Sequence, residues 1–221
     1  MSNILSAFKL VKNYQSGAEK VCAVNTVTLD VDEGNYLAIV GPSGSGKSTL
    51  LHLLGGLDTP SSGQVFFDGK NIYHLSDAKR AAWRNKNIGF VFQFYHLVEE
   101  LNVMENICVA AFSLKARAAS QKAKELLGYL GIEKRAKFFP SQLSGGEKQK
   151  VAFARALING PKIILCDEPT GNLDHDSQDK VIDLLEKINK EQKKTVIIVT
   201  HNLQLASRAH KTLSMESGAI K

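Results

Sequence analysis

Residues 41–49 read Gly41-Pro42-Ser43-Gly44-Ser45-Gly46-Lys47-Ser48-Thr49. The apolar runs Tyr36–Val40 and Leu50–Leu54 flank this loop, which predicts a strand, a loop and a helix in that order. The spacing G-x-x-x-x-G-K-S is typical of a phosphate-binding loop, where glycines let successive N–H groups point at phosphate oxygens and the helix N-terminus adds its positive end. We expect Lys47 to reach the terminal phosphates and Ser48 to bind Mg²⁺. Because spacing and context both match, a plain Gly/Ser turn is the weaker interpretation.

The bulk composition limits the class of protein. A chain of 221 residues can form one large α/β domain with an added lobe, but not two copies of it. The formal charge of +6 is spread over helical stretches without interleaved aromatic residues, which argues against nucleic acid as the partner. Three widely spaced cysteines suggest neither a disulfide framework nor a zinc site, and fit a reducing cytosol. No apolar run has the length of a membrane span, so we expect none.

The region before the loop has a strand-like pattern. Between Ile4 and Val31 apolar and polar residues alternate, which predicts two or three half-buried antiparallel strands. Tyr14 falls at the end of the first of them. It is either a half-buried strand aromatic or a surface on which a nucleotide base stacks, and the residues alone leave the two interpretations about even.

Polar side chains follow three apolar runs at the point where each predicted strand ends. Gln93 is the first, and it is a candidate ligand to Mg²⁺ or to water, with a plain strand-end amide as the alternative. In an α/β sheet such positions line the ligand crevice, because the carboxyl ends of parallel strands meet at one edge. The three strands are expected at Ile88–Phe92, Ile163–Cys166 and Thr195–Thr200.

The second and third of these strands lead into charged groups. Two adjacent carboxylates, Asp167 and Glu168, are costly at the end of a buried strand unless they have partners. Asp167 fits a carboxylate behind the Mg²⁺ shell, and Glu168 fits a base that polarises the attacking water. His201 could contact the γ-phosphate and orient Glu168, although a lone histidine is more often structural.

A second glycine-rich turn reads Leu143-Ser144-Gly145-Gly146-Glu147. Ser144 and Glu147 form an S-x-x-E capping box, so one interpretation is only a well-capped helix. The two glycines expose the backbone of the helix N-terminus, which helix capping does not require. They indicate a second anion site.

Between residues 94 and 140 the pattern becomes helical. Asn102 and Glu105 predict a helix start, and a second helix is expected from about Ser120 to Leu130. The segment Phe94–Glu105 mixes aromatic and acidic residues. It is either the docking groove of a partner or a filler of the joint between two lobes. In the first case Phe94, Tyr95 and Leu97 would be apolar anchors, and Glu99 and Glu100 a charged rim.

These motifs in this order resemble the ATPase subunit of ABC transporters, over essentially the whole chain. By this resemblance residues 41–48 are the Walker A motif, Gln93 the Q-loop, Leu143 to Glu147 the signature and Ile163 to Asp167 the Walker B motif. Glu168 is then the catalytic base, Asn172, Leu173 and Asp174 the D-loop of dimer contacts, and His201 the switch histidine. Tyr14 falls where the family has its adenine-stacking aromatic. The signature placed before an apolar strand ending in Asp-Glu is the most specific part.

The resemblance implies a fold and a set of partners. The fold is a RecA-like P-loop NTPase with a mixed, mostly parallel sheet, an antiparallel β subdomain and a small α-helical subdomain. Residues 1–93 and 141–221 would form one core, and residues 94–140 the helical subdomain of the same domain. ATP and Mg²⁺ are the implied cofactors, with Ser48, Gln93 and Asp167 at the metal. Two copies would bind ATP head to tail, attached to a permease at the cytoplasmic face of the inner membrane.

Three further stretches are similar to one branch of that family, the lipoprotein-releasing ATPases of Gram-negative inner membranes. They are Leu51–Pro60, Phe92–Leu97 and Thr200–Ala206. Related branches serve macrolide and peptide exporters and cell division, so these functions are the alternatives. Lys150 stands where relatives usually have Arg, and Cys166 where Ala or an aliphatic residue is common. A soluble ATPase acting on ribosomes or DNA usually has two fused units or a long coiled-coil insertion, and neither is present.

Overall fold

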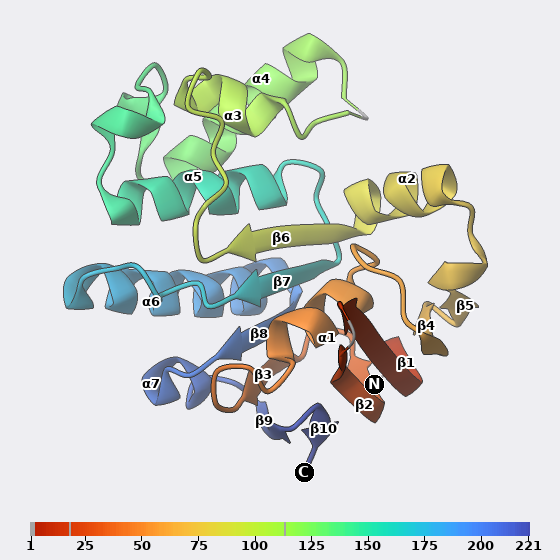
Figure 1. The fold of residues 1–221 in the computed structure, drawn as a ribbon. Coiled ribbons are helices and arrows are strands. Elements are labelled where there is room, and N and C mark those ends of the chain that lie inside the picture. Colours follow the sequence, from red (N-terminus) through yellow and green to blue (C-terminus); the bar gives the residue numbers. More distant parts are fainter. Residues whose placement is uncertain (1–2, 18, 113) are drawn as a thin grey trace.

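The computed structural model describes residues 3–17, 19–112 and 114–221. Helices cover both faces of a central sheet, and a second sheet lies beside it (Figure 1). The strands are β1 Asn3–Ser16, β2 Glu19–Asp32, β3 Tyr36–Val40, β4 Ser62–Phe67, β5 Lys70–Asn71, β6 Ile88–Phe92, β7 Ile163–Asp167, β8 Thr195–Thr200, β9 Lys211–Glu216 and β10 Ala219–Ile220. The helices are α1 Lys47–Leu54, α2 Asp77–Asn87, α3 Val103–Cys108, α4 Ala116–Tyr129, α5 Gly145–Leu157, α6 His175–Gln192 and α7 Leu203–Ala206.

The central sheet has the strand order β10-β9-β3-β8-β7-β6 in the described residues. Pairings between β9, β3, β8, β7 and β6 are all parallel, and β10 adds antiparallel to β9. Because parallel strands end at the same edge, the segments after β3, β6, β7 and β8 meet there. This confirms the predicted strands and the mixed, mostly parallel sheet.

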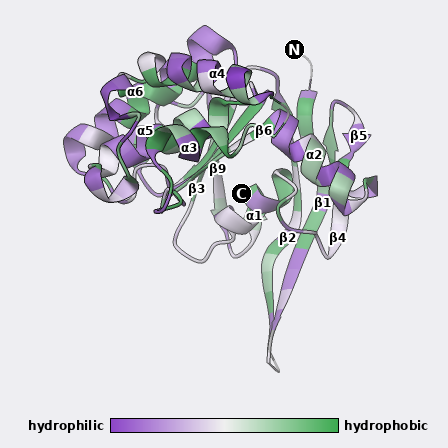
Figure 2. Ribbon diagram, turned by 90° about the horizontal axis from the view of Figure 1, so that it is seen from above, coloured by the Kyte–Doolittle hydropathy of each residue, from purple (hydrophilic) through white to green (hydrophobic). Residues whose placement is uncertain are grey.

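The two faces of the central sheet belong to different cores. Successive strand residues point to opposite faces, and Ile163 and Leu165 of β7 pack with α1 and the β1–β2–β4 region, whereas Ile164 and Cys166 pack with α5 and α6. All four side chains are buried. A parallel sheet covered on both faces is encoded by such unbroken apolar runs. Figure 2 shows the strands as mostly hydrophobic and the helices as mixed.

The second sheet is antiparallel, with the order β2-β1-β4-β5. The described residues of the region expected to hold two or three strands form β1 and β2, which pair with each other along most of their length. β1 also pairs with β4, so it lies between β2 and β4. Leucines of α1 fill the space between this sheet and the central one.

The helices α3, α4 and α5 pack together at the far side of β6 (Figure 1). As predicted, Asn102 and Glu105 form a capping box at the start of α3. The expected start of α4 near Ser120 was wrong, because the helix begins at Ala116. Alanine has the highest helix propensity, and the Ala-rich start, ARAA, extends the helix four residues before Ser120.

Candidate nucleotide-binding site

The glycine-rich loop follows β3 and turns into α1 at Lys47. Gly46 occupies the N-cap position in the left-handed region, with φ of 98°. A Cβ at this position would lie 1.9 Å from the carbonyl oxygen of Ala23 in β2. Any other residue would therefore have to displace the β2 backbone, and the loop is built around this glycine.

The Lys47 side chain is buried although it carries a charge. Its ammonium donates hydrogen bonds of 2.9 Å to the carbonyl oxygens of Gly41 and Pro42, which are neutral. An ammonium has three donors, so one remains for an anionic oxygen. Burying a cation against neutral carbonyls is costly, and a phosphate at the loop would compensate this cost. This arrangement fits the polyphosphate of a nucleotide.

Ser48 and Asp167 place two oxygens side by side at the end of β7. The Ser48 hydroxyl donates a 2.8 Å hydrogen bond to Oδ1 of Asp167, and Nε2 of His52 lies 3.9 Å from Oδ2. Burial raises the pKa of the Asp167 carboxyl, so its anionic form gains from a nearby cation. The described residues hold no cluster of three or more His, Cys, Asp or Glu side chains suited to a metal. The pair fits Mg²⁺, which binds through few protein oxygens plus phosphates and water.

Glu168 is held by contacts to the end of β8. Its Oε1 lies 2.9 Å from Nδ1 of His201, and its Oε2 accepts a 3.0 Å hydrogen bond from the Thr200 hydroxyl. Its backbone has a φ of 44°, uncommon for a residue other than glycine. This turn, held by a hydrogen bond from the Glu168 amide to the Val199 carbonyl, directs the carboxylate along the sheet edge.

Gln93, at the end of β6, contacts the predicted D-loop. The Asn172 side chain donates a 3.0 Å hydrogen bond to the Gln93 carbonyl oxygen, and the Gln93 amide lies 3.4 Å from the Asn172 side-chain oxygen. A Cβ on Gly171 would come within 2.7 Å of the Gln93 amide nitrogen, so glycine permits this approach. The other D-loop residues have local contacts: Leu173 packs on the core and Asp174 caps α6.

One cavity of about 720 Å³ brings most of the predicted residues together. Tyr14 of β1, three residues of β2, the glycine-rich loop and the polar strand ends all contribute to the lining. The lining consists of Tyr14, Val21, Cys22, Ala23, Ser43, Gly44, Gly46, Lys47, Ser48, Thr49, Gln93, Asp167, Glu168 and His201.

The predicted signature lies elsewhere. Ser144 caps α5, and its capping box with Glu147 is present as predicted. Ser144, Gly146 and Glu147 line a separate, smaller cavity with Ser177 of α6. A single chain therefore does not bring this anion site to the 720 Å³ cavity.

A comparison with protein families decides the identity of the chain. A family model described as ABC transporter matches residues 24–171. The chain belongs to the ABC transporter family. It is an ATP-binding cassette subunit, and the predicted P-loop α/β fold is confirmed. Within the described residues, no helix of this cassette has both the length and the apolarity that crossing a membrane requires.

Solved cassette structures are similar over nearly the full chain. Two structures of the cassette MJ0796, called bacterial in one of them, each have 37% identity and a TM-score of 0.92, covering 99% of this chain and 97% of their own. One is described as dimeric, and the other as a dimeric post-hydrolysis state bound to ADP and phosphate. CbiO1 from Clostridium perfringens, part of the ABC transporter complex CbiONQ, has 30% identity and a TM-score of 0.87, covering 100% of this chain and 88% of its own.

Sequence reasoning did not find several neighbours of the site. Thr200 and His52 contact Glu168 and Asp167, but their own patterns carry no signal for these contacts. Asn172 was predicted as a D-loop residue, but its hydrogen bond to Gln93 was not. Thr200 reads as a strand residue and His52 as one polar position in an apolar helix. Only their position after folding shows the role.

Proposed function

We propose that this cassette hydrolyses ATP as the motor subunit of a membrane transporter. The observation that carries the proposal is the Glu168 carboxylate, fixed by His201 and Thr200 in the same cavity as the glycine-rich loop. A general base needs a defined position close to the water that it activates. The post-hydrolysis structure of MJ0796 supports hydrolysis as the activity.

Different residues of the 720 Å³ cavity would bind the phosphates, the metal and the base of ATP and activate the attacking water. The loop amides and Lys47 would hold the β- and γ-phosphates of ATP. Ser48 and Asp167, with Gln93 at the rim, would hold Mg²⁺, which when bound neutralises charge that develops on the phosphates. Glu168 would accept the proton of the attacking water, and His201 would keep the carboxylate oriented toward it. The Tyr14 ring would stack on the adenine.

A second copy of the chain would complete each site. The signature faces a different cavity from the glycine-rich loop, so the Ser144 hydroxyl and the Gly146 amide would be available as donors to ATP held by another cassette. The D-loop would lie at the same contact. A head-to-tail dimer satisfies this geometry, and the dimeric MJ0796 structures support it. Because each chain would contribute its signature to the ATP of the other, the arrangement is symmetric and closes as a dimer.

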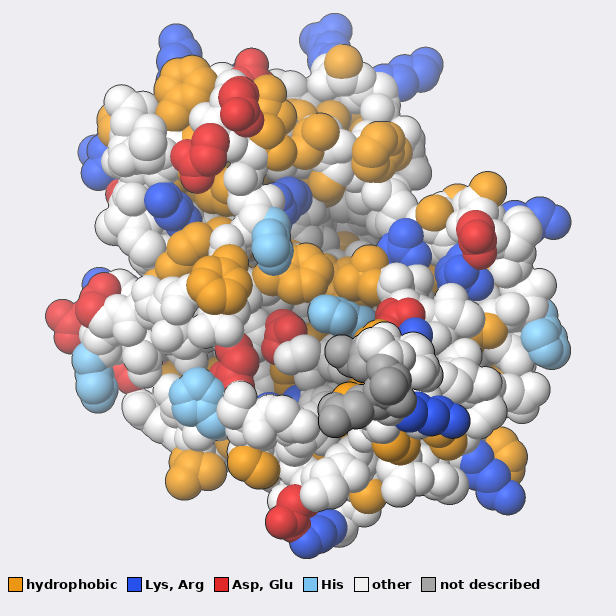
Figure 3. Space-filling view, in the orientation of Figure 1, with side chains coloured by type: hydrophobic (Ala, Val, Ile, Leu, Met, Phe, Trp, Pro, Cys, Tyr) orange, Lys and Arg blue, Asp and Glu red, His pale blue; other side chains and the backbone are white. Residues whose placement is uncertain are grey.

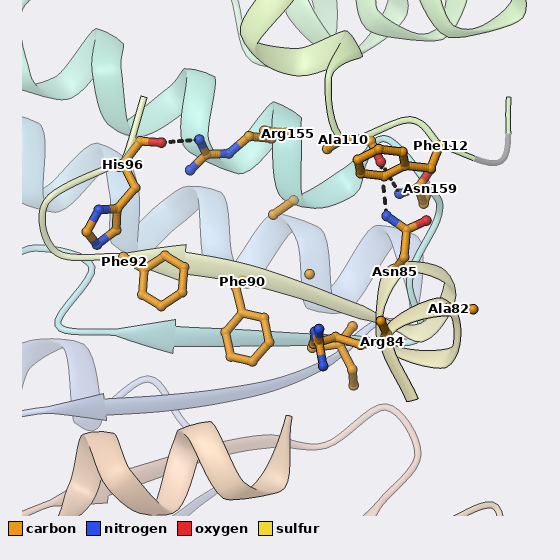
Figure 4. A pocket seen from close by; sticks show the side chains of 14 residues that line it. Ala82, Arg84, Asn85, Phe90, Phe92, His96, Ala110, Phe112, Arg155 and Asn159 are labelled. Carbon is orange, nitrogen blue, oxygen red and sulfur yellow. Dashed lines mark hydrogen bonds between the residues drawn. The ribbon is translucent and has the colours of Figure 1, made fainter. Parts of the chain in front are cut away.

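The permease would dock in a cavity of about 680 Å³ between the helical part and the central sheet (Figure 4). Its floor includes the stacked rings of Phe90 and Phe92, and Phe112 covers its upper side. Figure 3 shows hydrophobic side chains gathered between the upper and lower parts of this face. The lining consists of Ala81, Ala82, Arg84, Asn85, Ile88, Gly89, Phe90, Phe92, His96, Ala110, Phe112, Arg155, Ala156 and Asn159. An apolar floor with a polar edge is typical of an interface.

The segment Phe94–Glu105, which is expected either to form a docking groove or to fill the joint between two lobes, lies mostly outside this cavity. Of that segment, only His96 lines the cavity in the described structure, and Tyr95 instead places its hydroxyl near the Asn172 carbonyl. Leu97 packs on the core. The reason is a sharp turn: Tyr95 and His96 both have left-handed backbones, and the Arg155 guanidinium donates to both of their carbonyl oxygens. Tyr95 and His96 therefore contact different neighbours, while Phe94 is 67% exposed and remains a candidate anchor.

Phe112→Asp should weaken association with the permease by about 10-fold or more, because a carboxylate would replace an apolar contact at the cavity. The Phe112 side chain is 82% exposed, so the free cassette should keep its melting temperature and its ATP affinity. Co-purification of the cassette with its permease, followed by ATPase and transport assays, measures the effect. Leu203→Asp is the matched control, since Leu203 is similarly exposed but lies on α7. Equal association of Phe112→Asp and wild type would contradict this docking site.

The finer proposal is release of lipoproteins from the inner membrane, with the cassette bound peripherally to its cytoplasmic face. It rests on the similarity of residues 51–60, 92–97 and 200–206 to lipoprotein-releasing ATPases. Depleting the cassette in its host and separating the membranes on a density gradient tests it. Lipoproteins should accumulate in the inner membrane. Normal lipoprotein sorting with increased sensitivity to macrolides or peptides would instead favour an exporter, and a defect in septum formation would favour the cell-division branch.

A further inference from the structure

We propose that Asp58 and Lys12 are positioning residues for the nucleobase, because they hold the Tyr14 ring in place before the nucleotide binds. The inference rests on the proposed stacking of adenine on Tyr14. It assigns a function to the turn that follows α1, which neither the phosphate loop nor the hydrolytic groups explain.

The three side chains form a closed set of contacts. Oδ2 of Asp58 accepts a 2.7 Å hydrogen bond from the Tyr14 hydroxyl, and Oδ1 accepts a 2.6 Å bond from the Lys12 ammonium. The same ammonium lies 4.8 Å from the centroid of the Tyr14 ring. It also donates to the Thr59 carbonyl oxygen at 2.8 Å. Each side chain therefore contacts the other two.

The contacts join two distant parts of the chain. Lys12 and Tyr14 lie two residues apart on β1 and so point to the same face of the strand, whereas Asp58 follows α1. Asp58 is itself fixed, since the Tyr73 hydroxyl lies 2.7 Å from its carbonyl oxygen and 2.6 Å from that of Leu53, between which its one proton is shared. The position of the ring is thereby tied to the helix that begins in the phosphate loop.

The burial of Lys12 and the charges of Lys12 and Asp58 indicate that the contacts among Lys12, Tyr14 and Asp58 are stable. The Lys12 side chain is only 13% exposed, which is rare for lysine without a partner. Burial opposes ionisation of Asp58, but the hydrogen bonds from Lys12, Tyr14 and the Thr59 amide hold the pKa of its carboxyl below the ordinary value. Burial and the bond to Asp58 raise the pKa of the Tyr14 hydroxyl. At neutral pH, Asp58 is thus the anionic acceptor and Tyr14 the donor.

The arrangement leaves one face of Tyr14 to a ligand. Lys12 lies over the ring, and the side chain is still 40% exposed beside the 720 Å³ cavity. A ring that is already fixed loses less conformational freedom when a base stacks on it. The set should therefore raise the affinity for the base part of ATP without affecting the phosphates or the chemical step.

Affinities for ATP and for inorganic tripolyphosphate, measured by calorimetry on the full-length cassette, separate the two parts of the ligand. Tyr14→Phe keeps the ring but removes its bond, and Asp58→Ala removes the acceptor. Each should raise the Kd for ATP by about 3- to 10-fold, as expected for a side chain that must be ordered on binding. Neither should change the Kd for tripolyphosphate. In the ATPase assay KM should rise by the same factor while kcat stays constant.

Further variants test the set as a unit. The double variant Tyr14→Phe with Asp58→Ala should bind ATP no more weakly than Asp58→Ala alone, because both remove the same interaction. Lys12→Met should weaken ATP binding, and Lys12→Arg should restore most of it. Lys20→Met, at an exposed position on β2, is the control for net charge and should bind ATP like wild type.

Tyr14→Ala distinguishes failure of this inference from failure of the stacking that it assumes. If Tyr14→Ala binds ATP like wild type, Tyr14 does not contact the base. If Tyr14→Ala weakens ATP binding but Tyr14→Phe, Asp58→Ala and Lys12→Met do not, the base stacks on a ring that needs no support, and the positioning role is wrong. A loss of tripolyphosphate affinity in Tyr14→Phe, at an unchanged melting temperature, would also contradict it.

Discussion

Glu168→Gln should bind ATP with wild-type affinity and hydrolyse it about 10²- to 10⁴-fold more slowly, the usual cost of losing a general base. The amide has the same size and can still accept the hydrogen bond from Thr200, but it cannot take a proton from water. ATP would remain bound, so the dimer that it holds together should accumulate. Single-turnover hydrolysis and size-exclusion chromatography with ATP and Mg²⁺ measure the two effects.

Glu100→Gln is the matched control, since it removes an exposed carboxylate that does not line the cavity. It should hydrolyse ATP like wild type and elute like wild type. His201→Ala should slow hydrolysis without abolishing nucleotide binding, because it removes the partner that orients Glu168. A Glu168→Gln protein that stays monomeric with ATP and hydrolyses it at the normal rate would contradict the role of Glu168 as the general base.

Ser144→Arg should lower the rate of ATP hydrolysis by about 10²-fold or more, while the isolated cassette keeps its affinity for ATP. Ser144 lies at the N-terminus of α5, apart from the glycine-rich loop, so a bulky cation there blocks only a site formed with another copy. Losing a group that stabilises the transition state typically costs this much. ATPase rates at several protein concentrations and calorimetric titration of the monomer provide the measurements.

Mixing two inactive variants gives a sharper result. Lys47→Ala should lose ATP affinity, because it removes the buried ammonium of the loop. A heterodimer of Ser144→Arg with Lys47→Ala still has one complete site, formed from Lys47 of the first chain and Ser144 of the second. The mixture should therefore hydrolyse ATP although neither variant does so alone. A wild-type rate that increases linearly with concentration would contradict the shared site. Ser144→Ala controls for the lost helix cap, worth about 0.5–2 kcal/mol.

The start of α4 was misplaced because the expected start near Ser120 left out the alanines before it, whose high helix propensity extends the helix to Ala116. The conformation of the segment that begins at Phe94 depends on contacts made far along the chain. Arg155 on α5, about 60 residues further along the chain, holds the turn at Tyr95 and His96 that separates those side chains.

The sequence by itself determined the local elements and the order of the chemical groups. Glycines, an apolar strand and a capped helix are encoded within a few residues, so the phosphate loop at Gly41–Ser48 and the polar strand ends at Gln93, Asp167 and His201 can be identified without a fold. Parallel pairing then requires these ends to meet at one edge. This is why most lining residues of the 720 Å³ cavity could be predicted, whereas Val21, Cys22 and Ala23 of β2 were not.

Only the tertiary structure decided which side chains support those groups. Thr200 on Glu168, Asn172 on Gln93, and Asp58 with Lys12 on Tyr14 are contacts between residues far apart in the chain. Their geometry depends on strand order, sheet twist and the packing of α1 between two sheets, none of which is encoded in a local pattern. A hydrogen bond requires its donor and acceptor to lie within a few tenths of an ångström of the right place, and only the packed fold sets positions that closely.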